Sequence, residues 1–155
     1  MGDAPGTVSA TYAGGMADIR DRDDILVLVR TFYRSAFQDP RIGRIFTEVA
    51  HMDLDHHLPI MGDFWESVLF QTGGYHRNAL ALHTALNARH PLTAEHFDRW
   101  LHLWTATVDD LYEGPVAERA KAQAGRIAES IQRRLQGGSG SLLDTIRIRP
   151  DADAT

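Results

Sequence analysis

Two histidines lie where an α-helix would turn its side chains toward the protein interior. His57 is followed four residues later by Met61 and seven residues later by Phe64, a spacing that places all three on one helical face. His83 shares the apolar side of a second, shorter helical pattern with Leu86. A neutral imidazole is a good metal ligand, although a single inward histidine is more commonly a core side chain that donates to a backbone carbonyl. The pair therefore favours a binding site without naming its ligand.

Three aromatic residues with polar tips accompany these histidines. Tyr33, Trp100 and Trp104 lie at or beside the apolar stripes of their helices. Tyrosine and tryptophan in such stripes usually serve as core residues, but each also carries one hydrogen-bond donor that needs a partner when buried. Together with the two inward histidines, they indicate a buried site that contains donors, and composition alone leaves its occupant open.

Other kinds of chemistry have weaker support. The chain contains no cysteine, which excludes disulfides, thiolate metal sites, cysteine nucleophiles and covalent c-type haem attachment. There is no His-Glu-x-x-His pair for zinc, and the adjacent residues His56 and His57 diverge on a helix. No Gly-rich phosphate loop or Rossmann fingerprint is present, so any redox turnover would need an external electron donor.

The elements that must position these residues are all helical, because every strong apolar pattern has a helical period. We expect helices over about 22–38, from residue 53 or 55 to Gly73, and over about 78–86, with a connector at 42–46. A further helix is capped by Thr93, and a last one begins at Gly114-Pro115. Thr72 is expected on the buried side of the second helix. The predicted domain is 20–136, with a flexible N-terminal extension (1–19) and a flexible C-terminal tail (137–155).

Composition narrows the class of protein further. The chain has 155 residues, enough for one domain, of which 43% are hydrophobic and 24% charged, as in ordinary soluble proteins. Its formal net charge of -5 argues against nucleic acid as a partner. No apolar run is long enough for a membrane span, and the first residues lack a signal-peptide core, so a cytoplasmic location is expected.

Several short motifs occur in a characteristic order along the chain, from about Asp23 to Leu135. They are Phe32-Tyr33, Asp39-Pro40-x-Ile42-Gly43-x-Ile45-Phe46, His57-x-x-x-Met61-Gly62-Asp63-Phe64-Trp65, Gly73-x-Tyr75, His83-x-x-Leu86 and His96-Phe97-x-Arg99-Trp100-Leu101. Each motif is weak when taken singly, but their order and spacing are specific. This set resembles that of the truncated haemoglobins, most closely those of group III.

The resemblance implies an all-α, globin-like fold, in which a two-over-two helical sandwich surrounds a b-type haem (iron protoporphyrin IX). His83 matches the proximal ligand of the haem iron. Tyr33, His57 and Trp100 match the polar positions of the distal pocket, where they would stabilise a bound ligand. The side chains expected to hold the porphyrin by burial are Phe46, Met61, Leu86, Phe97 and Leu101.

The function implied is reversible binding of oxygen, and of other diatomic gases such as nitric oxide or carbon monoxide, at ferrous haem iron. Three distal donors are more than oxygen storage requires, which favours redox chemistry on nitric oxide or reactive oxygen species. Activity as a nitric oxide dioxygenase or peroxidase stays open and would need an external reductase. Two alternatives are a helical interaction module without haem and a gas sensor that signals through a partner.

Overall fold

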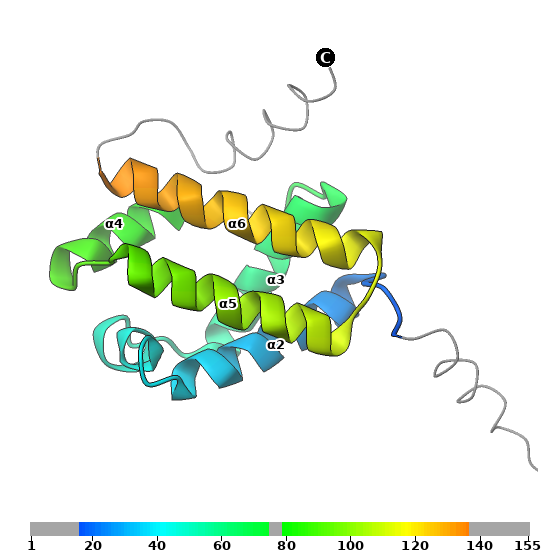
Figure 1. The fold of residues 1–155 in the computed structure, drawn as a ribbon, viewed down its shortest axis with the longest axis horizontal. Coiled ribbons are helices and arrows are strands. Elements are labelled where there is room, and N and C mark those ends of the chain that lie inside the picture. The colour runs from blue at the N-terminus through cyan, green and yellow to red at the C-terminus, as the bar shows by residue number, and fades with distance from the viewer. Residues whose placement is uncertain (1–15, 75–78, 137–155) are drawn as a thin grey trace, which may run out of the picture.

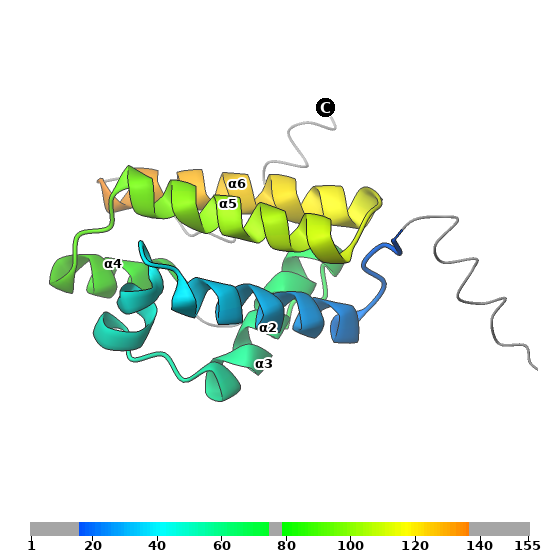
Figure 2. The same cartoon turned by 60° about the horizontal axis from the view of Figure 1, so that its bottom comes forward.

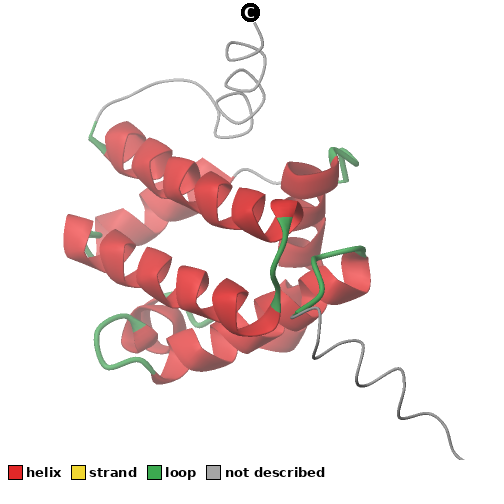
Figure 3. Cartoon of the chain, turned by 45° about the vertical axis from the view of Figure 1, so that its right-hand side comes forward, coloured by secondary structure: helices red, strands yellow, loops and turns green. Residues whose placement is uncertain are grey.

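The computed structural model describes residues 16–74 and 79–136, and this described part of the chain is helical without strands (Figures 1 and 3). Its elements are, in chain order, α2 (Arg22–Gln38), the π-helical segment η1 (Ile45–Val49), α3 (Leu54–Phe70), α4 (Ala79–Arg89), α5 (Ala94–Leu111) and α6 (Pro115–Leu135). The predicted all-α class is therefore confirmed. The predicted connector at 42–46 leads into η1, which buries Ile45.

The helices form two layers with a shorter helix at one end. Helices α5 and α6 run antiparallel and side by side, and together they cover α2 and α3 (Figures 1 and 2). Helix α4 lies at one end of the assembly, where it contacts α6. This is the expected two-over-two arrangement, and it leaves the core enclosed between the two helix pairs and α4.

Local capping explains where several helices begin. The carboxylate of Asp21 accepts a hydrogen bond of 3.0 Å from the backbone N–H of Asp24 at the start of α2. Thr93 precedes α5 as predicted, and its backbone N–H donates to Nδ1 of His96 over 3.0 Å. Pro115 occupies the first turn of α6, where its missing N–H has no helical partner to lose.

The crossing of α2 and α3 depends on a close approach at Gly62. A Cβ atom at this position would lie 2.8 Å from Cδ2 of Leu26, so the Leu26 side chain would have to shift to admit a larger residue. Arg22 also links the helices, because its guanidinium donates to Asp63 over 2.8 Å and to the carbonyl of Pro59 over 3.2 Å. Helix α3 continues through Pro59, and the N–H of His57 keeps its bond of 3.0 Å to the carbonyl of Asp53.

Two residues of the predicted N-terminal extension, Asp18 and Ile19, contact the helices. Ile19 is only 2% exposed and belongs to the hydrophobic core. Asp18 accepts hydrogen bonds from the backbone N–H groups of Val116 and Ala117 at 2.9 and 2.8 Å, which caps the first turn of α6. The remainder of the predicted N-terminal extension, 1–15, and the predicted tail, 137–155, lie outside the described residues.

One predicted core position is wrong. Thr72 is exposed because α3 ends at Phe70, and Gln71 adopts a left-handed conformation with φ of 57°. Leu58 and Leu69, which were not assigned to the apolar stripe of this helix, are buried instead. Within the two described segments, 16–74 and 79–136, every helix is too short or too polar to cross a lipid bilayer.

Candidate functional site

The helices enclose a cavity of about 300 Å³, a volume at the lower end of the range for ligand pockets. Side chains from α2 through α6 and from η1 line it, and most of them are apolar. The lining includes eight of the nine predicted site residues: Tyr33, Phe46, His57, Met61, His83, Leu86, Phe97 and Trp100. The fold thus gathers residues that lie up to 67 positions apart in the sequence (100 minus 33) around one space.

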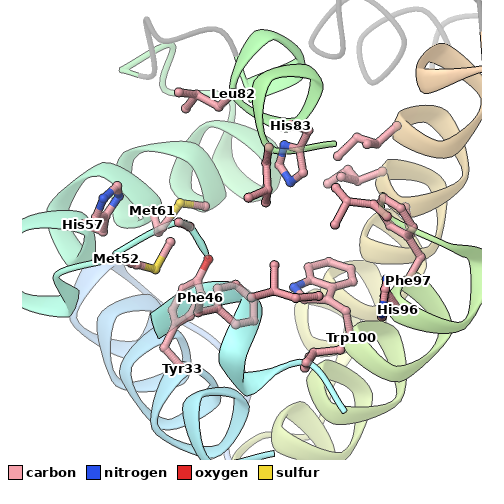
Figure 4. A pocket seen from close by; sticks show the side chains of 18 of the residues that line it. Tyr33, Phe46, Met52, His57, Met61, Leu82, His83, His96, Phe97 and Trp100 are labelled. Atoms are coloured by element: carbon pink, nitrogen blue, oxygen red, sulfur yellow. The ribbon is translucent and has the colours of Figure 1, made fainter. Parts of the chain in front are cut away.

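His83 comes from α4, the short helix at the end of the assembly. Its imidazole is partly buried and points into the cavity, toward the side on which Tyr33 and Trp100 lie (Figure 4). Leu86, one helical turn further along α4, lines the same cavity. Helix α4 therefore presents one candidate metal ligand between the apolar side chains of Leu82 and Leu86.

Tyr33 faces the same space from α2. It is 7% exposed, and its ring makes edge-to-face contacts with Phe32 and Phe46 at centroid distances of 5.0 and 5.7 Å. The phenolic oxygen points toward the middle of the cavity (Figure 4). These ring contacts hold the side chain in the orientation that brings its hydroxyl opposite His83.

Trp100 belongs to a column of three indoles. Its ring is nearly parallel to that of Trp104, with centroids 6.1 Å apart and planes 8° apart. Trp104 in turn stacks on Trp65 at 4.4 Å, and its own N–H donates to the carbonyl of Ala120 over 3.2 Å. Since Trp104 is held by this bond and by both neighbours, it fixes the plane of Trp100, whose indole nitrogen faces the cavity (Figure 4).

His57 lines the cavity from α3 but lies nearer its edge. In Figure 4, Met52 and Met61 lie between its ring and the space below His83. The ring of the neighbouring His56 makes an edge contact with it at 5.5 Å. Tyr33 and Trp100 are therefore the two predicted donors that approach the middle of the cavity, while His57 lies at the side.

Leu101 is a predicted site residue that the structure does not bring to the cavity. It is half-buried and packs against the hydrophobic core. It follows Trp100 directly, so it points about 100° away around α5. Its contact with a porphyrin stays a prediction.

Further residues line the cavity that were not predicted from the sequence, among them Met52, Leu82, Arg89 and His96. Met52 lies in the loop before α3, where no helical periodicity indicates its direction. Leu82 is 55% exposed, so a search for buried apolar positions does not find it. A signal did exist for His96, since it lies three residues after the helix cap Thr93.

The imidazole of His96 combines a structural contact with a place in the cavity wall. Its Nδ1 accepts the bond from Thr93, and its ring centroid lies 5.6 Å from that of His90. Burial lowers the pKa of His96, and the neighbouring His90 lowers it further. His96 therefore favours the neutral form, which its capping bond requires.

The side chains that could ligate a metal indicate which kind of metal group the cavity could hold. Among the residues that the structure describes, no group of three or more His, Cys, Asp or Glu side chains is placed to hold a metal ion. With the described side chains alone, a metal at His83 would need further ligands from outside the protein. A mostly apolar cavity into which the imidazole of His83 points fits a metal held in a flat organic macrocycle, as in haem.

Comparison with known proteins agrees with this geometry. The fold is similar to the crystal structure of a group III truncated hemoglobin from Campylobacter jejuni, with a TM-score of 0.69 and 25% sequence identity. The similarity covers 81% of this chain and 100% of the other. No protein-family profile matches the chain, and no curated protein matches it by sequence. The resemblance inferred from the motifs is confirmed at the level of the whole fold.

Proposed function

We propose, on the premise that this chain has the fold of a truncated haemoglobin, that its cavity binds haem b and that His83 would hold the iron. The observation that carries this proposal is the single imidazole on α4 that points into an apolar cavity. The absence of cysteine from the sequence means that the haem would be held without thioether bonds.

The apolar lining would hold the porphyrin mainly by burial. Phe46 and Met61 come from one side of the cavity, and Leu86 and Phe97 come from α4 and α5. Each Å² of apolar surface removed from water contributes about 25 cal/mol, before the costs of ordering are subtracted. The same side chains exclude water, which strengthens any hydrogen bond made inside the cavity.

When bound, the haem would supply a ferrous iron that can bind a diatomic gas. Tyr33 and Trp100 lie on the side of the cavity toward which His83 points. The hydroxyl of Tyr33 and the indole N–H of Trp100 would donate to a gas ligand that carries partial negative charge. Oxygen is such a ligand, so we assign reversible oxygen binding, with nitric oxide and carbon monoxide as further ligands.

Haem titration tests this assignment with two signals. Wild-type protein should develop a Soret band at one equivalent of haem. All three tryptophans of the chain line the cavity, so haem should also quench most of the tryptophan fluorescence by energy transfer. A folded helical protein that shows neither signal would refute the proposal and favour an interaction module without haem.

The two central donors also favour a second candidate, the oxidation of nitric oxide by bound oxygen. Donors on two different helices that face one small space can polarise a bound ligand more strongly than a single donor. The chain would then need an external reductase for turnover. Mixing the oxygenated protein with nitric oxide in stopped flow should give ferric protein and nitrate rapidly. Slow oxidation without nitrate would leave reversible gas binding as the function.

A further inference from the structure

Asp39, at the C-terminal end of α2, is a buried carboxylate with an unusually complete set of partners. Its side chain is only 3% exposed. One oxygen accepts two hydrogen bonds from the guanidinium of Arg99 on α5, at 2.9 Å from Nε and 2.6 Å from Nη2. The other oxygen accepts from the backbone N–H groups of Arg41 and Ile42 at 3.0 and 3.1 Å.

These four bonds keep the buried carboxylate charged. Burial raises the pKa of Asp39, but the hydrogen bonds from Arg99, Arg41 and Ile42 outweigh burial and leave the pKa below its ordinary value. A charge that is buried and fully hydrogen-bonded tolerates little change in geometry, since removing one partner leaves the other uncompensated. The pair therefore fixes a distance between α2 and α5.

On the α5 side, Arg99 directly precedes Trp100. The plane of the Trp100 ring is set by stacking on Trp104. Stacking leaves the ring free to slide within that plane, whereas the bond from Arg99 to Asp39 holds the backbone of α5 against the end of α2. The position of the Trp100 indole N–H thus depends on this bond as well as on the ring contacts with Trp104 and Phe32.

On the α2 side, Asp39 accepts hydrogen bonds from the turn that follows it, and this turn leads to Phe46, which contacts Tyr33. The N–H of Gly43 donates to the carbonyl of Asp39 over 2.9 Å, which closes the turn. A Cβ atom at Gly43 would lie 2.4 Å from the carbonyl oxygen of Phe37, so the turn folds back tightly on α2. Phe46 then packs on Tyr33 at 5.7 Å.

We propose that the Asp39–Arg99 pair is a positioning clasp that sets where the Tyr33 hydroxyl and the Trp100 indole N–H lie relative to each other and to the ligand. The proposal rests on the gas-binding function proposed above. Neither residue lines the cavity, so the clasp acts only through the two donors and does not touch the ligand. Loss of the pair should change the geometry of the hydrogen bonds from Tyr33 and Trp100 to the ligand, even where the protein remains folded and loaded with haem.

The test compares three variants, Asp39→Asn, Arg99→Gln and Arg99→Lys, in haem-loaded protein. The readouts are the C–O stretching frequency of the ferrous carbonmonoxy form and the oxygen dissociation rate. Arg99→Gln and Asp39→Asn should each shift or split the C–O band and raise the dissociation rate severalfold. Arg99→Lys keeps the charge but not the planar two-nitrogen geometry, so it should fall between Arg99→Gln and wild type.

A matched control separates positioning from general stability. Val108 is fully buried on α5 but does not line the cavity, so Val108→Ala should lower the unfolding temperature and leave the C–O band unchanged. Variants of the pair that lose stability while keeping the wild-type band and dissociation rate would overturn the clasp and leave gas binding intact. Wild-type protein that takes up no haem would instead refute the proposed function, and the clasp with it.

Discussion

Replacing Tyr33 by Phe removes one hydroxyl and almost no volume, so it measures what that donor does for a bound ligand. The ring of Tyr33 is 7% exposed and packs against Phe32, Phe37 and Phe46 at centroid distances of 5.0, 6.0 and 5.7 Å. A Phe ring can keep all three contacts. The substitution should therefore leave the fold and the haem affinity close to wild type.

The expected effect on oxygen follows from the loss of one hydrogen bond to a ligand with partial negative charge. Such a bond contributes about 1.5–3 kcal/mol, which corresponds to an oxygen dissociation rate roughly tenfold to a hundredfold higher in Tyr33→Phe. Trp100→Phe should act in the same direction. The double variant should fall short of the product of the two effects, because both donors serve one ligand.

Stopped-flow displacement of oxygen by excess carbon monoxide measures this rate directly. The carbon monoxide dissociation rate provides an internal control, since that ligand carries little negative charge and should be less affected by the same substitution. Equal oxygen dissociation rates in wild type, Tyr33→Phe and Trp100→Phe would show that neither donor reaches the ligand. That result would refute the distal assignment drawn from the cavity geometry, without affecting haem binding itself.

Three further predictions concern the metal ligand and two polar contacts of the fold. His83→Gly should lose the wild-type ferrous haem spectrum, and added imidazole should restore it, whereas His96→Ala should keep the spectrum; a normal spectrum in His83→Gly would place the ligand elsewhere. Tyr112 donates to the carbonyl of Asp24 over 2.9 Å, and burial, followed by the nearby Asp24 charge, raises the pKa of Tyr112 to about 12. Because this folded-state pKa lies above the unfolded value of about 10, the stabilisation should be complete below about pH 10 and lost as the pH rises toward 12. Denaturant unfolding of wild type and Tyr112→Phe across that range checks this, and parallel curves for the two proteins would contradict it. Asp18→Ala removes the cap of α6 and should cost about 1 kcal/mol of unfolding free energy at neutral pH. Burial raises the pKa of Asp18, but hydrogen bonds from Val116, Ala117 and Ile19 leave it lowered overall. The difference between Asp18→Ala and wild type should therefore disappear as the pH falls through and below about 4, and a difference that persists in acid would argue against the capping carboxylate.

Local signals in the sequence were sufficient to predict most helix boundaries. Asp39-Pro40 ends α2, Thr93 caps α5 and Gly114-Pro115 begins α6, as expected. Each of these signals acts through the backbone of its immediate neighbours, so no distant contact is needed to interpret it. Helical periodicity likewise identified the buried face of α2, because a helix that packs on a core must turn one apolar side toward it.

The motif set also identified the fold, and eight of the nine site residues that it predicted line the cavity. Spacing along a helix, however, indicates only the direction of a side chain. It does not indicate which element lies opposite or how far the side chain reaches. For this reason Leu101 was assigned to the site although it packs on the core, and the edge position of His57 beside Met52 could not be foreseen. Met52 was not predicted because it lies in a loop, where the sequence shows no helical repeat of apolar residues.

The pairing of Asp39 with Arg99 is a property of the tertiary structure. The two residues are 60 positions apart, and either one could have been an ordinary surface charge. Only the packing of α5 across the end of α2 buries the carboxylate and brings the guanidinium to it, because desolvation and pairing of a charge depend on everything that surrounds it. The sequence alone determined which residue types could bind haem and a gas, whereas the packing of the helices determined which of them face the same cavity.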